Sequence, residues 1–294
     1  MNMEAVTRLA NAVLYEGYML YPYRPSAVKN RRRFNFGVLV PPSYSAAQNG
    51  TESSVMRAEC LVCGSPQTSI DLRLRYLHVL PGDWQQVIEQ ELNLSAWIAA
   101  ARASARMRRE SGQPLEVDLR ATAEYLEDGL FKLSAEVTNQ TALDDPERYS
   151  RDEVLPYSLV AAHMILTVHD GEFVSLLDPP DRFRHSAEKC RQQGCWPVLA
   201  GDPGTHDTVL ASPIILYDYA ETAPESPGDL FDGAEIDEIL TLRILTLTDE
   251  EKQEARNGDE RVRRMLERSE ALPEEHLLKL HGVLRGLRTV KEQK

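Results

Sequence analysis

The sequence predicts an α+β protein with an antiparallel, sandwich-like β core and a helical C-terminal extension. Several segments alternate apolar and polar residues with a period of two, which is typical of half-buried strands. Asp-Gly dipeptides at 128–129 and 170–171 each stand between two such segments, as in tight β-hairpins. Beyond residue 232 the chain is dense in charge and carries helix-capping patterns. We therefore expect a β-rich main domain over 1–232 and a helical extension over 233–294.

The first segments of the chain predict a helix, a strand and a loop. Apolar residues at helical spacing favour a short amphipathic helix over 4–14. Residues 33–39 alternate well enough to form a strand. The turn-forming residues of 41–54 indicate a surface loop.

Two strands are expected next, over 55–63 and 69–80. In the second strand Ile70, Leu72 and Leu74 share one face, while charged residues occupy the other. The intervening Gly-Ser-Pro-Gln-Thr is typical of a hairpin connection.

The middle of the chain predicts one helix and two further hairpins. Residues 83–109 favour a helix, because several of their large apolar residues are spaced for one helical face. Around the first Asp-Gly dipeptide, 115–125 should pair with 130–139. Around the second, 159–169 should pair with 172–177.

The last third of the β-rich domain begins with a loop and ends with a strand. Proline and glycine are frequent over 178–206, which predicts irregular structure, and 208–217 reads as a strand. Asp232 and Thr248 each precede a Glu by three residues, which predicts two consecutive helix starts, although 239–247 could also form a strand. The charge-dense residues that follow predict a moderately exposed helical tail.

The composition excludes several classes of function. With 33 Lys plus Arg against 46 Asp plus Glu, the 294-residue chain has a formal charge of -13, which disfavours nucleic-acid and anionic-membrane binding. No apolar run approaches the length of a membrane-spanning helix, so we expect no membrane insertion. Charged residues interrupt the first twenty positions, so we expect a cytoplasmic protein without an export signal.

Four cysteines form two pairs that suggest a metal site. Cys60 and Cys63 enclose two residues, and Cys190 and Cys195 enclose four. Four thiolates can bind zinc or an iron–sulfur cluster. However, residues three apart on a strand point to opposite faces, so the first pair chelates a metal only if the strand turns sharply. The alternative is that these cysteines pack as small core residues.

An acidic segment follows the last predicted strand, with apolar residues among its carboxylates and no Lys or Arg from 218 to 238. Such a segment either remains solvated or contacts a partner protein. A basic, aromatic-rich segment near the N-terminus is its counterpart. We predict a partner-binding surface over 212–238 together with 15–33. Its candidate residues are Tyr21, Tyr23, Arg24, Arg31, Tyr217, Asp229, Phe231, Asp232 and Glu235.

Two blocks of sequence carry a family resemblance. The first is Tyr-Glu-Gly-Tyr-Met-Leu-Tyr-Pro-Tyr-Arg-Pro at 15–25, followed by Arg-Phe-Asn-Phe-Gly-Val at 33–38. The second is Ser-Pro-Ile-Ile-Leu-Tyr-Asp-Tyr at 212–219, followed by Asp-Leu-Phe-Asp-Gly-Ala-Glu-Ile-Asp-Glu-Ile-Leu from 229. Together they resemble an uncharacterised protein family encoded beside actinobacterial-type, high-affinity [NiFe] uptake hydrogenases. That family has no assigned activity, so the resemblance implies no catalytic residue.

The resemblance implies a role in assembly, maturation or stable association with a hydrogenase. We therefore expect a non-catalytic accessory factor whose partners are hydrogenase subunits or maturation proteins. One alternative is a zinc or iron–sulfur protein that uses its four cysteines. A weaker alternative is an enzyme with a loop-borne site in 178–206.

Overall fold

The computed structural model describes residues 2–24, 27, 30, 34–81, 86–100, 102–109, 114–221, 230–231 and 237–273. The chain divides into two compact units. The first comprises Met1–Tyr18 and Arg32–Glu221, and the second comprises Met19–Arg31 and Thr222–Lys294. The N-terminal segment 19–31 thus belongs with the C-terminal helices. The domain boundary that the sequence predicts, between 232 and 233, lies outside the described residues.

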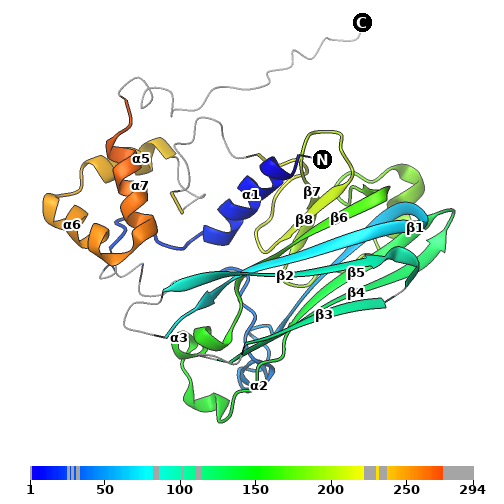
Figure 1. Ribbon diagram of the computed structural model, residues 1–294, viewed down its shortest axis with the longest axis horizontal. Coiled ribbons are helices and arrows are strands. Elements are labelled where there is room, and N and C mark those ends of the chain that lie inside the picture. Colours follow the sequence, from blue (N-terminus) through cyan, green and yellow to red (C-terminus); the bar gives the residue numbers. More distant parts are fainter. Residues whose placement is uncertain are drawn as a thin grey trace, which may run out of the picture. The chain divides into compact units, whose positions relative to one another are not determined.

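The first unit contains one antiparallel sheet of eight strands, which confirms the predicted α+β class (Figure 1). The strand order is β3-β4-β5-β1-β6-β8-β7, and β2 also pairs with β1. The strands are β1 (Val55–Val79), β2 (Val87–Trp97), β3 (Arg102–Arg109), β4 (Leu115–Glu127), β5 (Leu130–Asn139), β6 (Val160–Val174), β7 (Trp196–Leu199) and β8 (Thr208–Ser212). The predicted strand over 208–217 is therefore shorter than expected.

The long strand β1 makes the sheet sandwich-like. Its first half pairs with β5, its second half pairs with β2, and β6 pairs along its other edge. Because β5 and β2 occupy the same edge of β1 in succession, the sheet divides there into two layers. The two layers enclose one large apolar cluster, to which β1 to β6 all contribute. Strands β2 and β3 lie next to each other without forming a ladder.

Strand β1 is continuous, so the predicted hairpin between 55–63 and 69–80 is wrong. In place of a reversal there is a bulge, where Gly64 faces Gly171 of β6 but Ser69 already faces His169. The chain passes so tightly that a Cβ on Gly64 would lie 2.3 Å from Thr68 Oγ1. Glycine therefore serves a close approach here, not a hairpin turn.

Strand β6 is likewise continuous through the second Asp-Gly dipeptide, so the hairpin predicted there is wrong. The Thr68 hydroxyl donates a hydrogen bond to the Asp170 carbonyl oxygen at 2.7 Å. A Cβ on Gly171 would lie 2.8 Å from Thr68 Cγ2. By contrast, the hairpin predicted at the first dipeptide is confirmed: β4 and β5 pair on either side of Asp128 and Gly129, both of which have positive φ.

The helix predicted over 83–109 is wrong, because the described residues of this range form mainly β2 and β3, with only the short helix η2 (Ile98–Ala100) between them. Ile88 and Leu92, four residues apart, share a face in a strand as well as in a helix. The strand alternation continues through Leu94 and Ala96, which pack with Leu92 in or against the central cluster. The apolar spacing was therefore compatible with both structures, and pairing with β1 selected the strand.

Helix α1 (Met3–Tyr15) confirms the predicted amphipathic helix and covers the outer face of β6 and β8 with Val6, Leu9 and Val13.

The predicted strand over 33–39 is wrong in its described part, where only Leu39 forms a bridge, to Leu159. Positive φ at Phe34 and Gly37 prevents an extended strand. The predicted loop over 41–54 contains helix α2 (Pro42–Ala47), which Pro42 starts.

The remaining elements of this unit are short helices. They are η2 (Ile98–Ala100), η3 (Pro146–Arg148), α3 (Arg151–Val154), η4 (Leu155–Tyr157), η5 (Asp181–Phe183) and α4 (Arg184–Ala187).

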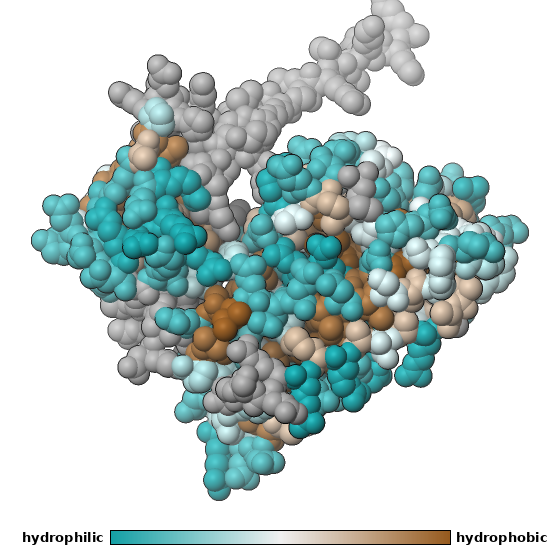
Figure 2. Space-filling model, in the orientation of Figure 1, coloured by the Kyte–Doolittle hydropathy of each residue, from teal (hydrophilic) through white to brown (hydrophobic). Residues whose placement is uncertain are grey.

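The second unit contains α5 (Asp237–Leu245), α6 (Asp249–Gly258) and α7 (Glu260–Glu270) in its described part. The capping box predicted at Thr248 is confirmed. The Thr248 hydroxyl accepts a hydrogen bond from the backbone N–H of Glu251, and the Glu251 side chain accepts one from the backbone N–H of Thr248. Hydrophilic residues cover α6 and α7 (Figure 2). The start predicted at Asp232 and the tail from 274 lie outside the described residues. Within the described part, no helix is long and apolar enough to cross a membrane.

Candidate functional site

The four cysteines point to two different apolar clusters. Cys60 and Cys195 pack in the central cluster between the layers. Cys63 and Cys190 pack against a smaller cluster on the outer side of β1. The opposite directions of Cys60 and Cys63 follow from their spacing of three on one strand, as the sequence indicates.

Burial keeps these thiols protonated at neutral pH. It raises the pKa of Cys190 to about 11 and that of Cys195 to about 12. The pKa of Cys60 lies well above its ordinary value, and that of Cys63 is also raised, in both cases chiefly by burial. No group of three or more His, Cys, Asp or Glu side chains that could hold a metal occurs among the described residues. The predicted metal-binding role therefore gains no geometric support from that part of the chain.

Three of the predicted partner-binding residues instead stabilise the second unit from within. Tyr23 is 0% exposed and donates a hydrogen bond to the Leu230 carbonyl oxygen at 3.0 Å. Phe231, 5% exposed, is also buried. Arg24 forms ion pairs of 3.2 Å with Glu251 and 3.7 Å with Glu254 of α6.

Tyr21 is half-buried, and the guanidinium of Arg243 lies 5.6 Å from its ring centroid. Buried side chains cannot form an exposed docking surface, so the structure corrects the prediction for Tyr23 and Phe231. The remaining predicted residues of this group, Arg31, Asp229, Asp232 and Glu235, lie outside the described residues.

Tyr217 has a different environment, on the segment 213–219 that follows β8, here called the edge segment. Ile214 and Leu216 pack inward against the cluster beneath α1. Ile215 and Tyr217 alternate with them and remain 73% and 65% exposed. The backbone N–H of Tyr219 donates to the carbonyl oxygen of Leu199, which ties the segment to β7. The edge segment therefore presents two apolar side chains on a fixed backbone.

The predicted loop over 178–206 closes an edge of the sheet. Gln193 forms a bridge with Arg57 of β1, with both backbone hydrogen bonds at 2.9 Å. The Gln192 side chain bonds both backbone groups of Glu59. These contacts supply hydrogen-bond partners to the backbone of β1 at Arg57 and Glu59, where β6 does not pair with β1. Since they hold this part of the loop in a structural role, they provide no support for a catalytic site there.

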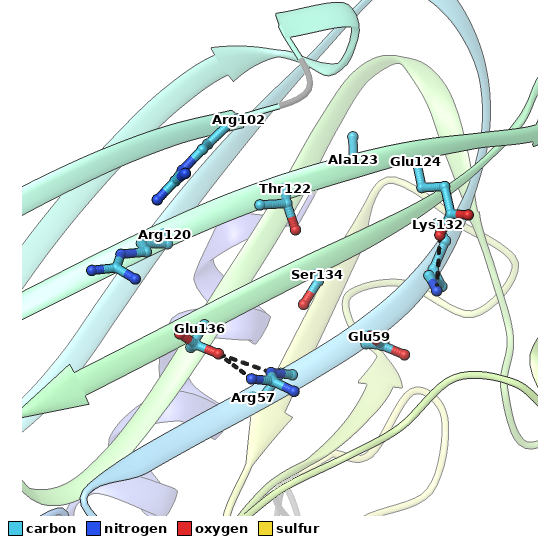
Figure 3. A pocket seen from close by; sticks show the side chains of 10 residues that line it. All are labelled: Arg57, Glu59, Arg102, Arg120, Thr122, Ala123, Glu124, Lys132, Ser134 and Glu136. Carbon is cyan, nitrogen blue, oxygen red and sulfur yellow. Dashed lines mark hydrogen bonds and ion pairs between the residues drawn. The ribbon is translucent and has the colours of Figure 1, made fainter.

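A pocket of about 370 Å³ lies on the outer face of the layer formed by β1, β5, β4 and β3 (Figure 3). We call it the sheet-face pocket. Alternate residues of these strands face outward while the residues between them fill the core, so side chains from four strands meet on one face. The lining residues are Arg57, Glu59, Arg102, Arg120, Thr122, Ala123, Glu124, Lys132, Ser134 and Glu136.

Ion pairs form two walls of the sheet-face pocket. Arg57 donates two hydrogen bonds to Glu136 Oε2, at 2.9 and 2.5 Å. On the other side Lys132 Nζ lies 3.0 Å from Glu124 Oε2. That hydrogen bond raises the pKa of Lys132, and the nearby Glu59 contributes in the same direction. Between the walls, Ser134 and Thr122 form a floor of short hydroxyl side chains (Figure 3).

Sequence reasoning missed this pocket. Each contributing strand shows only an ordinary polar face in the sequence, and the pocket exists because of the strand order and register. The period-two alternation of β4 and β5 was visible, but the pairing of β5 with the first half of β1 was not.

A second, larger pocket of about 600 Å³ lies beside η3 and α3. Tyr149 and Tyr157, in an edge-to-face contact of 5.7 Å, form part of its wall. Its carboxylates include Asp145, which pairs with Arg148, and Glu153, which caps α3. These partners give the two carboxylates structural roles.

Comparisons with known proteins identify no family. No protein-family description matches the chain, and neither does any curated protein. Among solved structures, the chain shows a slight similarity to two crystal structures of scytalido-glutamic peptidase, one with a peptide-based transition-state analog and one with a transition-state analog inhibitor. The identities are 8% and 9%, and the TM-scores are 0.15 and 0.14. Each match covers 60% of this chain and 96% of the other. A likeness of this size supports no conclusion about fold or activity.

Proposed function

We propose that this protein is a non-catalytic accessory, assembly or interaction factor for a [NiFe] uptake hydrogenase. The observation that carries the proposal is the edge segment, which holds Ile215 and Tyr217 outward. Exposed apolar and aromatic side chains on a rigid backbone are typical anchors of protein interfaces, because they lose little conformational freedom when a partner covers them. The edge segment also lies in one of the two sequence blocks that resemble the hydrogenase-associated family.

Two further features agree with a binding role. The thiols of Cys190 and Cys195 are protonated at neutral pH, which makes them poor nucleophiles. Trp196 of β7, which pairs with Ser212 just before the edge segment, is also exposed.

The test is affinity purification of the full chain from cells that express the hydrogenase, with mass spectrometry of the co-purifying proteins. We expect hydrogenase subunits or maturation proteins in near-stoichiometric amounts. The double variant Ile215→Ser with Tyr217→Ala should reduce their recovery about tenfold or more, since interface anchors contribute over about 1 kcal/mol each. Tyr125→Ala is the matched control, because Tyr125 is 61% exposed on a different strand.

Recovery that is unchanged in the double variant would remove the edge segment from the interface. The absence of any specific co-purifying hydrogenase protein would contradict the function itself. Charge reversal by Asp229→Lys, Asp232→Lys and Glu235→Lys tests the acidic part of the predicted surface, and we expect it to weaken recovery while the fold persists.

A further inference from the structure

One line of side chains crosses the floor of the sheet-face pocket from β1 to β3. The register places Glu59 opposite Ser134, Ser134 opposite Thr122, and Thr122 opposite Arg102. We call these four residues the floor row. Adjacent strands are about 4.8 Å apart, so the row extends about 14 Å between its end Cα atoms. A carboxylate therefore stands at one end, a guanidinium at the other, and two hydroxyls between them (Figure 3).

The rows on either side of the floor row are already neutralised. Arg57 is paired with Glu136 in one, and Lys132 with Glu124 in the other. Paired charges of this kind attract a further ion only weakly, because each already has an opposite charge in contact. A charged ligand is thus directed to the floor row between them.

Neither charged group of the floor row forms an ion pair in the described part of the chain, and Lys132, which lies near Glu59, is itself paired with Glu124. Arg102 is exposed, and its side chain makes no hydrogen bond or ion pair with a described residue. Glu59 accepts one hydrogen bond, at 2.8 Å from the backbone N–H of Arg191, and has no ion-pair partner among the same residues. The hydroxyls of Ser134 and Thr122 likewise make no hydrogen bond to described residues.

Arg120 strengthens the cationic end of the floor row. Its side chain runs in the same direction as that of Arg102 on the neighbouring strand (Figure 3). Arg120 pairs with Asp118 at 2.5 Å, so this end holds two guanidinium groups against one carboxylate. A guanidinium presents a planar set of donors that fits a carboxylate ligand.

We propose that the sheet-face pocket binds a short zwitterionic peptide, with its free ammonium group at Glu59 and its free carboxylate at Arg102. An extended tripeptide is about 10 Å long, which is comparable with the length of about 14 Å between the end Cα atoms of the row. The hydroxyls of Ser134 and Thr122 complement the peptide groups of the ligand, since each hydroxyl both donates and accepts. This site is separate from the edge segment and does not rest on the hydrogenase proposal.

Isothermal titration calorimetry of the full chain with triglycine tests the proposal. We expect one saturable site. Glu59→Gln and Arg102→Gln should each weaken binding at least tenfold, because each removes one of the two charged contacts. Arg106→Gln is the matched control, since Arg106 lies on the same strand outside the pocket lining, and it should bind as the wild type does.

Two modified peptides give a readout that does not depend on the variants. N-acetyl-triglycine lacks the ammonium group and triglycine amide lacks the carboxylate, so both should bind the wild type at least tenfold more weakly. N-acetyl-triglycine should bind the wild type and Glu59→Gln with equal affinity, because the group that contacts Glu59 is absent. The proposal is overturned if wild type shows no saturable binding of triglycine at millimolar concentrations. It is equally overturned if Glu59→Gln and Arg102→Gln bind triglycine as the wild type does.

Discussion

The carboxylate of Asp218 accepts a hydrogen bond from the backbone N–H of Leu199 at 2.8 Å, and this contact fixes the edge segment to β7. The other carboxylate oxygen accepts from the hydroxyl of Ser175 at 2.5 Å. The carbonyl oxygen of Leu199 also accepts a hydrogen bond from the backbone N–H of Tyr219, so both outward-facing backbone groups of Leu199 are paired. One acidic residue thus closes the free edge of a short strand and orients the exposed Ile215 and Tyr217.

Replacing Asp218 with Ala should therefore loosen the edge segment. The variant leaves the Leu199 N–H without its acceptor, a change that typically costs about 1–3 kcal/mol when the group is buried. We expect amide hydrogen exchange at Leu199 to accelerate by about tenfold to a hundredfold. Asp218→Asn is the control, because its side-chain carbonyl can still accept this hydrogen bond. Equal protection in the wild type and the Ala variant would contradict the assigned role.

The cysteine thiols should react slowly in the folded protein. A pKa of about 11 leaves Cys190 almost entirely protonated at pH 7.5, and only the thiolate is a good nucleophile. We expect iodoacetamide to alkylate Cys190 roughly 100-fold more slowly than an unperturbed cysteine. Mass spectrometry after timed labelling, with and without urea, measures this difference. Rapid native labelling of Cys190 would show that its thiol is activated.

The metal-binding alternative makes a separate prediction. Because Cys60 and Cys63 point to different apolar clusters, we expect the purified protein to contain less than stoichiometric zinc and iron. Elemental analysis of protein purified without chelators measures the content. One metal per chain that is lost in the double variant Cys60→Ser with Cys63→Ser would establish the alternative instead.

His163 should make the protein sensitive to acid. Burial lowers its pKa to about 4, and the adjacent positive charge of Arg75 acts in the same direction. The unfolded chain therefore binds a proton on this residue between about pH 6.5 and 4 when the folded chain does not. The free energy of unfolding should fall as the pH drops through this range, by up to about 3 kcal/mol from this residue.

Urea unfolding of the wild type and of His163→Gln at several pH values measures this contribution. The variant should show a shallower decline, because glutamine does not titrate. His185→Gln is the control, since His185 is exposed on α4. An identical pH dependence in the wild type and His163→Gln would contradict the assignment.

Tyr23 should matter for the stability of the second unit. Tyr23→Phe removes the hydroxyl that donates to the Leu230 carbonyl oxygen and leaves that acceptor without this bond. We expect a loss of about 1 kcal/mol in the free energy of unfolding of this unit. Tyr21→Phe is the control, because the Tyr21 hydroxyl makes no hydrogen bond within the described part of the chain. Thermal unfolding followed by the signal of the helices compares the two variants, and equal midpoints would contradict the prediction.

The two Asp-Gly dipeptides show how far local sequence determines this fold. At 128–129 both residues have positive φ, and the flanking segments pair directly across a tight turn. At 170–171 the same dipeptide lies within a continuous strand, because Thr68 of β1 bonds the Asp170 carbonyl oxygen and packs on Gly171. The same local signal thus has two outcomes, and a residue about one hundred positions away decides between them.

The candidate sites, like the two dipeptides, depend partly on local sequence and partly on contacts between distant residues. The sequence placed Tyr217 in a predicted partner-binding segment, and the structure leaves Ile215 and Tyr217 of that segment exposed. The sequence also grouped Tyr23 and Phe231 with this surface, whereas packing buries both within the helical unit. The sequence by itself determined what is local: α1, the β4–β5 hairpin and the cap at Thr248, because each depends on neighbours a few residues away. The tertiary structure alone decided the path of β1, the strands over 83–109 and the floor row from Glu59 to Arg102, because strand register is set by contacts between residues far apart in the chain.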